Sequence, residues 1–220
     1  MPDLPWRRRE TSGAGRNERL AYVLECAERF GWRFFPVHGV RADGACTCGN
    51  PTCARVGKHP ATPHGLLDAS NNPERLTLWW RETPWANPGL ATGRDPYPEA
   101  TRPPEERPVR AAIVVLDLDL GQGKHGDDTL AQLEEQHGRL PEAPMTLTGG
   151  GGRHLYFAHP GGHVGNRAGI RPGIDLRGDG GCIVLPPSIH PSGNTYEWVP
   201  GRAPGEHSLA SLPPFFLRHA

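Results

Sequence analysis

The sequence lacks an excess of charge, a long apolar run and almost all lysine. Its 24 basic and 24 acidic residues cancel, which argues against a uniformly basic nucleic-acid coat protein but allows a local basic groove. Only Lys58 and Lys124 are lysines. Arginine is the better bidentate partner of phosphate, although genomic base composition explains the same bias. No segment is long enough to span a membrane, and the N-terminus lacks the apolar core of a signal peptide. We expect a cytoplasmic chain without a membrane partner.

Cysteine is also scarce, and three of the five cysteines are crowded into one short segment. Such crowding suits a metal in a reducing compartment better than disulfides. Three thiolates and an imidazole fit tetrahedral structural zinc, although the spacing is not the usual C-x₂-C pair. The predicted zinc ligands are Cys46, Cys48, Cys53 and His59. His38 and His64 are alternative fourth ligands, and a loop of free thiols is the competing interpretation.

The chain has the length of one sizeable domain, and its glycines and prolines lie in blocks between apolar runs. We therefore expect long ordered loops on a folded core. Residues 1–16 are polar and predict a flexible N-terminus, 17–212 form the main domain and 213–220 a tail. Within the domain, 39–71 is a cysteine-containing loop and 94–110, which shows no periodicity, is an exposed insertion.

Helix signals come mainly early in the chain and strand signals cluster late. A helix is predicted from an N-cap at Asn17 to Gly31, a second after Asn72-Pro73, and a third from Asp127 to about Gly138. Strands are predicted near 32–38, 89–92, 111–120, 145–148, 154–158, 174–177, 182–185 and 195–198. This order favours an α+β fold with a mixed or antiparallel central sheet flanked by helices.

Two aspartates lie in the most apolar strand, at Asp117 and Asp119. Residues two apart on a strand point to the same face, about 6.6 Å apart. Two neighbouring buried carboxylates repel each other unless a cation lies between them, and Mg²⁺ or Mn²⁺ prefers carboxylate oxygen. The pair therefore predicts a divalent metal site. The other interpretation is a strand end whose aspartates cap the following glycine loop.

Four glycines, 149–152, precede Arg153 and His154. Bare backbone N–H groups can approach phosphate oxygens closely, and a histidine at the start of the next strand can reach the same place. A plain hairpin is the alternative. The run matches neither a Walker loop nor a dinucleotide fingerprint.

A third acid, Asp175, lies two residues before Arg177, and a proline-stiffened loop presents Ser188 and His190. Asp175 and Arg177 could simply form an ion pair. If Asp175 joins the first two acids, three carboxylates could hold two metal ions. Arg177 would then bind phosphate or compensate charge.

Taken in order, these segments resemble the bifunctional DNA primase/polymerase (prim-pol) family of the archaeo-eukaryotic primase superfamily. The resemblance runs from about Asn17 to Trp198. Its motifs are Gly31-Trp32, Gly57-Lys58-His59-Pro60, Trp79-Trp80, Asn87-Pro88-Gly89, Thr92-Gly93, 115–119, 148–157, 172–178, 186–193 and Tyr196-Glu197-Trp198.

The resemblance implies a primase/polymerase-type α+β core with a small zinc-knuckle-like loop. It implies catalytic acids at Asp117 and Asp119, a nucleotide-phosphate histidine at His154 and a third metal-site acid at Asp175. Mg²⁺ or Mn²⁺ and a structural Zn²⁺ are the expected cofactors. Expected partners are NTP or dNTP, single-stranded or primed DNA, and a separate helicase.

The predicted function is therefore template-dependent nucleotidyl transfer, with Arg177, Ser188 and His190 helping His154 to orient the triphosphate. Two other interpretations stay open. The same acids would serve a metal-dependent phosphohydrolase or nuclease. A catalytically silent nucleotide- or nucleic-acid-binding module of a replication or defence complex would keep the fold without the reaction.

Overall fold

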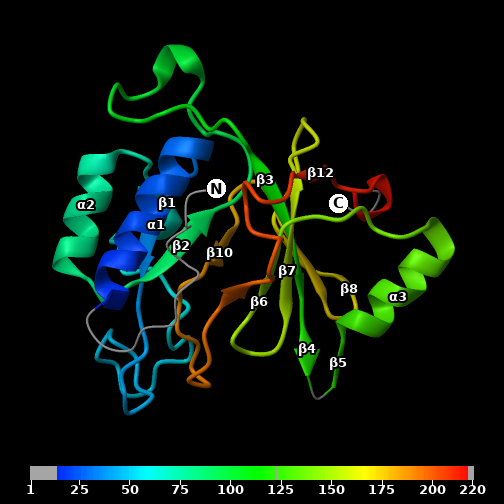
Figure 1. The fold of residues 1–220 in the computed structure, drawn as a ribbon, viewed down its shortest axis with the longest axis horizontal. Helices are drawn as coiled ribbons and strands as arrows, with labels where there is room; N and C mark the ends of the chain where they lie inside the picture. Colours follow the sequence, from blue (N-terminus) through cyan, green and yellow to red (C-terminus); the bar gives the residue numbers. More distant parts are fainter. Residues whose placement is uncertain (1–13, 122, 218–220) are drawn as a thin grey trace.

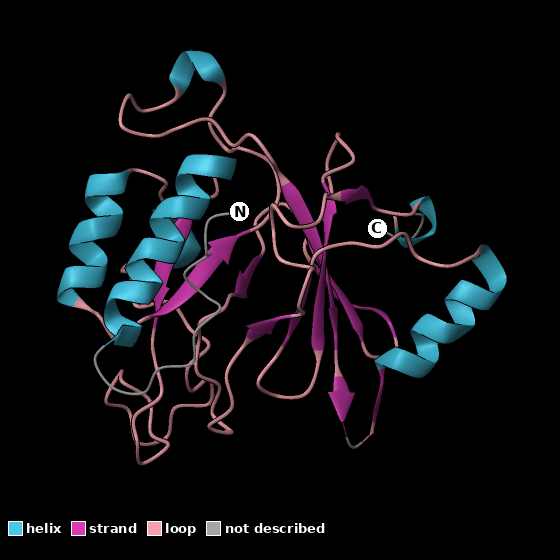
Figure 2. Cartoon of the chain, viewed as in Figure 1, coloured by secondary structure: helices cyan, strands magenta, loops and turns pink. Residues whose placement is uncertain are grey.

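The structure is a computed structural model that describes residues 14–121 and 123–217, with side chains from residue 18 onward. Two β-sheets lie next to each other, with helices α1 and α2 beside the smaller sheet and α3 beside the larger one (Figure 1). Figure 2 shows that long loops join these elements, in agreement with the glycine and proline blocks of the sequence. The α+β class predicted from the sequence is confirmed.

The smaller sheet has the strand order β1-β2-β10, with both pairs antiparallel. Its strands are β1 (Phe34–Val37), β2 (Asn87–Ala91) and β10 (Cys182–Val184), and its helices are α1 (Ala14–Phe30) and α2 (Pro73–Glu82). Val23, Leu76 and Trp80 of the helices pack with Phe34 and Leu90 in one buried core. The helices therefore cover one face of this sheet, while Phe35 and Val37 of the opposite face pack with Ala69.

The predicted start of the second helix is confirmed, and that of the first is wrong. Asn72 caps α2, because its side chain accepts hydrogen bonds from the backbone N–H groups of Glu74 and Arg75, and Pro73 occupies the first helical position. Helix α1 already begins at Ala14, so Asn17 lies inside it rather than at its cap. Of the N-terminus expected to be flexible, residues 1–13 lie outside the described residues.

The larger sheet has the order β11-β6-β7-β3-β9-β8, with β12 paired to β7. Only the β12–β7 pair is parallel among the pairs of this sheet that the structure describes, so the sheet is mixed but largely antiparallel. Its strands are β3 (Ile113–Leu118), β6 (Met145–Leu147), β7 (Arg153–Ala158), β8 (Arg167–Arg171), β9 (Ile174–Arg177), β11 (Glu197–Trp198) and β12 (Ala210–Ser211).

Strand β3 is buried on both faces, which explains its continuous apolar run. Val114, Leu116 and Leu118 face the core beneath α3 (Gly126–His137). Ile113 and Val115 face the core shared with α1, α2 and the smaller sheet. Asp117 is the next residue along this second face. The face therefore changes from apolar to acidic near the end of the strand.

The central sheet predicted as one unit is in fact two sheets, together with a small hairpin of β4 (Leu120–Gly121) and β5 (Lys124–His125). The predicted strand 111–120 is also shorter, since β3 ends at Leu118 and leaves Asp119 just beyond it. Of the predicted tail 213–220, the structure describes residues 213–217, which pack on the larger sheet's core. Its 3₁₀ turn η4 (Pro214–Phe216) buries Phe216 in the α3 core.

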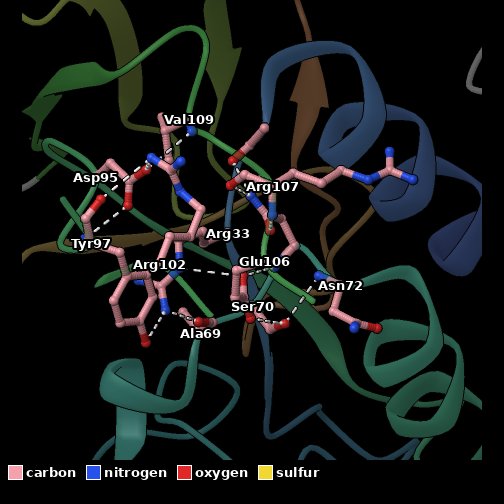
Figure 3. Close-up of polar contacts among 12 residues, drawn as sticks. Arg33, Ala69, Ser70, Asn72, Asp95, Tyr97, Arg102, Glu106, Arg107 and Val109 are labelled. Atoms are coloured by element: carbon pink, nitrogen blue, oxygen red, sulfur yellow. Dashed lines mark hydrogen bonds and ion pairs between the residues drawn. The ribbon is translucent and has the colours of Figure 1, made fainter. Parts of the chain in front are cut away.

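The insertion 94–110, which includes the 3₁₀ turn η3 (Glu99–Thr101), is exposed at most positions but anchored by a buried acid. The Ser70 hydroxyl donates to Glu106 at 2.5 Å, and the backbone N–H of Asn71 donates at 3.0 Å (Figure 3). Arg33 lies 3.8 Å from the same carboxylate and packs over the Tyr97 ring. The prediction of a simply exposed insertion is therefore wrong at Glu106. None of the residues of this network lines the cavity between the two sheets that is described below.

Candidate nucleotide and metal site

A cavity of about 740 Å³ lies between the uncovered face of the smaller sheet and the larger sheet. Phe35, Val37 and Val184 of the smaller sheet form an apolar part of its lining. Asp117 and His154 line it from the larger sheet. The volume is in the range of small-molecule and cofactor sites, about 300–1,000 Å³.

Three predicted site residues form one row across the larger sheet. Asp117 on β3 is directly opposite His154 on β7 and directly opposite Asp175 on β9. Directly opposed residues of antiparallel strands project from the same face, with Cβ atoms about 5 Å apart. The central position of β3 thus brings together side chains that are far apart in the sequence.

Arg177 is the cation that stabilises this row in the structure. Its Nη2 lies 3.0 Å from Asp117 Oδ2 and 2.6 Å from Asp175 Oδ2. His154 Nε2 lies 3.5 Å from Asp117 Oδ1. Burial opposes ionisation of Asp117, but His154 and Arg177 outweigh it and hold the pKa of this carboxyl well below its usual range. The ion-pair interpretation of Asp175 and Arg177 is therefore confirmed, and the same guanidinium also bonds Asp117.

Asp119 reaches the same cavity from outside the strand. Its backbone N–H donates to the Gly173 carbonyl at 2.9 Å, and its half-exposed carboxylate lies 2.8 Å from Lys124 Nζ. The bond to Asp119 raises the pKa of Lys124. Asp119 thus lies one residue beyond β3 and not on the strand as predicted, and both acids line the cavity.

The donor set suits a hard divalent cation, because Asp117, Asp119 and Asp175 offer only carboxylate oxygen. In the structure these acids are compensated by protein cations, Arg177 and Lys124. A metal ion between Asp117 and Asp175 would take the place of the Arg177 guanidinium. His154 Nδ1 is buried and has no hydrogen-bond partner among the described residues. The row therefore also contains one unsatisfied polar atom.

The glycine run forms a closed turn instead of an open set of N–H donors. Gly151 N donates to the Thr148 carbonyl and Gly152 N to the Thr148 hydroxyl, both at 2.9 Å. These two groups are therefore already bonded, against the phosphate-cradle expectation. Gly149 is required by packing, because a Cβ there would lie 2.3 Å from the Cβ of His190.

The two polar residues predicted in the loop before β11 lie in different environments. His190 lines the cavity, whereas Ser188 is fully buried, has an unbonded Oγ and is not among the cavity residues. Burial and the nearby charge of Lys58 lower the pKa of His190. A direct phosphate contact by Ser188 is therefore not available in this conformation.

Three basic residues of the cavity were not among the site residues predicted from the sequence. Lys124 comes from the β4–β5 hairpin, while Arg55 and Lys58 come from the cysteine-containing loop. The chain's only two lysines thus line the same cavity. Their rarity was a usable signal, because an ammonium is a compact point charge that contacts phosphate without fixed geometry.

The cysteine-containing loop gathers the four predicted zinc ligands. The ligand atoms of Cys46, Cys48, Cys53 and His59 all lie within 4.8 Å of one another. His59 Nε2 is 3.4 Å from Cys46 Sγ and 3.5 Å from Cys53 Sγ. Zinc bond lengths give a nitrogen–sulfur edge of about 3.6 Å in a tetrahedral site, so the loop fits the ion.

The structure also decides between the three candidate histidines. His38 Nδ1 pairs with the Thr47 hydroxyl and His64 Nδ1 with Asp68, whereas His59 faces the thiols. Although burial opposes ionisation, hydrogen bonds from the backbone of Cys48 and Gly57 help to lower the pKa of Cys46 to about 6. A thiolate at neutral pH is the form that binds zinc.

A sequence model of the family described as bifunctional DNA primase/polymerase, N-terminal, matches residues 23–215. The chain belongs to this prim-pol family. No curated protein matches the chain closely enough to report. Membership of the prim-pol family implies an enzyme of the nucleotidyltransferase type, acting in primase or polymerase chemistry on DNA and nucleotides. None of the described helices is long and apolar enough to cross a membrane.

Proposed function

We propose that this prim-pol chain joins nucleotides on a DNA template, with residues 17–212 as its catalytic domain. The observation that supports this most is the His154–Asp117–Asp175 row, in which His154 and Asp117 line a nucleotide-sized cavity and Asp175, outside the lining, lies opposite Asp117. Basic side chains from other segments line the same cavity, as a triphosphate requires, and they include Arg55, Lys58, Lys124 and His190.

Asp117, Asp119 and Asp175 would hold two divalent ions, Mg²⁺ or Mn²⁺. Such ions supply two effects when bound: a lower pKa of the primer 3′-hydroxyl and neutralisation of the triphosphate. Arg177 already lies between two of the acids, so a small rotation would transfer its guanidinium from carboxylate to phosphate.

His154 would donate to a triphosphate oxygen through Nε2 while its ring stays fixed by burial. Lys58 and His190 would contact the triphosphate from the opposite side. Orientation and charge neutralisation then provide most of the rate increase, with no covalent intermediate. Because base pairing reads the template, protein contacts to DNA should be mainly to its backbone.

Structural zinc would hold the cysteine-containing loop against the smaller sheet. The cysteines of the described structure are free, which suits the proposed cytoplasmic location. A separate helicase remains a proposed partner. A priming assay on unprimed single-stranded DNA, with ribo- and deoxynucleotides in turn, would decide between initiation and extension.

The test is incorporation of labelled dNTP on a primed template by the wild type and by Asp117→Ala with Asp119→Ala. We expect extension by the wild type and none by the double variant, with circular dichroism unchanged. Shortening of the primer alone would instead indicate a nuclease. Unchanged incorporation by the double variant would contradict the assignment of the acids, and binding without any reaction would indicate a silent module.

A further inference from the structure

One buried side chain, Asn87, joins two loops that line the cavity. It is at the start of β2 and is fully buried. Its Nδ2 donates to the carbonyls of Gly57 at 3.2 Å and Ile189 at 3.0 Å. Its Oδ1 accepts from the Ile189 N–H at 3.1 Å. Asn87 therefore satisfies backbone groups of both loops at once.

The first of these loops carries both a zinc ligand and a cavity cation. Gly57 is followed directly by Lys58, which lines the cavity, and by His59 of the Cys₃His cluster. Gly57 has a φ of +68°, and a Cβ there would lie 2.7 Å from Val40 Cγ2. The backbone between the zinc ligands and Lys58 is thus closely confined.

The second loop connects Asn87 to the glycine turn beside His154. Next to Ile189, His190 donates its N–H to the Asn194 carbonyl at 2.8 Å. Ser192 Oγ and Asn194 Nδ2 both donate to the Gly149 carbonyl, at 2.7 and 3.2 Å. A chain of hydrogen bonds therefore runs from the Cys₃His loop through Asn87 to the turn that precedes His154.

We infer that Asn87 is a positioning residue that holds Lys58 and His190 toward the triphosphate, so that zinc occupancy sets nucleotide affinity. The inference rests on the proposed function, because it assigns the cavity to a nucleotide. Asn87 itself is not among the residues that line the cavity. Its effect must therefore pass through the two loops that it joins.

Asn71 provides a matched control, because it is equally buried and makes the same pattern of bonds elsewhere. Its Nδ2 donates to the carbonyls of Gly31 and Arg107, at 2.8 and 2.7 Å, and its Oδ1 accepts from the Arg107 N–H at 2.7 Å. It anchors the insertion and does not line the cavity. Asn71→Asp and Asn87→Asp therefore remove the same kind of donor from two places.

The experiment measures the Kd for dATP in the presence of Mn²⁺ by titration calorimetry, with zinc content, Tm, KM and kcat for each full-length variant. We expect Asn87→Asp to raise Kd and KM about ten-fold and to change kcat less than about three-fold, with zinc retained. Asn71→Asp should lower the Tm about as much as Asn87→Asp does, and it should leave the Kd for dATP unchanged. Chelation of zinc should raise the Kd of the wild type but barely change that of Asn87→Asp.

Equal Kd values for the two aspartate variants would overturn the inference while leaving the proposed function intact. A wild type that binds no dATP would overturn both. If Asn87→Asp does not fold, the zinc-free wild type still decides when it is measured below its own Tm: an unchanged Kd after chelation contradicts the coupling, and a raised Kd in the folded protein supports it.

Discussion

The Cys₃His loop and the acid row on the larger sheet both suit metal ions, but the protein assembles them to different degrees. In the loop, four ligand atoms already lie within 4.8 Å of one another. In the acid row, Arg177 lies between Asp117 and Asp175, and Asp119 pairs with Lys124. The loop fits a permanently bound ion, whereas the carboxylates of the acid row are neutralised by cationic side chains of the protein.

This difference has a physical basis in the roles proposed for the two sites. A structural zinc contributes directly to folding, so its ligands gain from being close in the folded chain. Catalytic ions arrive with a triphosphate, and an acid row without any cation would suffer repulsion between buried carboxylates. Arg177 and Lys124 remove that repulsion, and in the proposed function they would then bind phosphate. The predictions below test whether the two sites differ in this way.

The largest expected effect is loss of zinc from the loop. Cys46→Ser should abolish zinc binding and lower the Tm strongly, because the free energy of metal binding is part of the folding free energy. Elemental analysis and thermal denaturation measure the two effects. Cys26→Ala is the control, since this thiol is buried in the α1 core outside the cluster. Retention of zinc by Cys46→Ser would show that this residue is not a ligand.

A smaller effect is expected from Arg177→Gln, which leaves Asp117 and Asp175 without their shared cation. The variant should lose about 1–3 kcal/mol of stability in metal-free buffer. Mn²⁺ should restore more stability to it than to the wild type, while its affinity for dATP falls. Thermal denaturation across a Mn²⁺ titration measures this. Arg94→Gln, which loses the partner Asp179 outside the cavity, is the control. Equal Mn²⁺ responses in wild type and Arg177→Gln would mean that Arg177 does not compete with the metal.

The acid row should also make the stability of the folded protein depend on pH in the acid range. The pKa of Asp117 is lower in the folded state than its unfolded value of about 3.9, so its stabilisation is complete above that value. It is lost as the pH falls toward the folded pKa. In metal-free buffer, Asp117→Asn should therefore show a weaker fall of Tm below about pH 4 than the wild type. Parallel curves would assign the acid sensitivity to other groups.

The smallest effect is expected from Lys124→Ala, because its pair with Asp119 is half exposed. Stability should change by less than about 1 kcal/mol, and KM for the nucleotide should rise only about two- to three-fold. Steady-state kinetics at two salt concentrations measure this, since screening should reduce the difference. Lys58→Ala gives a comparison from the other side of the cavity, because Lys58 is itself proposed to contact the triphosphate. A large loss of kcat in Lys124→Ala would mean that this lysine acts on the reacting atoms.

Much of the fold could be predicted because its signals are local. The Asn72 cap, the apolar run of β3 and the glycine after α3 each depend on a few neighbouring residues. The missed strand β8 carries Arg167, Gly169 and Arg171, which give no apolar alternation. The end of β3 before Asp119 was missed because the apolar pattern continues through Leu120.

The sequence by itself determined the α+β class, and it indicated Cys46, Cys48, Cys53 and His59 as candidate zinc ligands and Asp117 and Asp119 as candidate site acids. Residue type and close spacing are enough for these, since ligand chemistry and strand periodicity act over short distances. Only the tertiary structure placed His154 and Asp175 on either side of Asp117, chose His59 over His38 and His64, and excluded Ser188 from the cavity. Strand pairing and burial join distant residues, and no local pattern encodes which strands become neighbours.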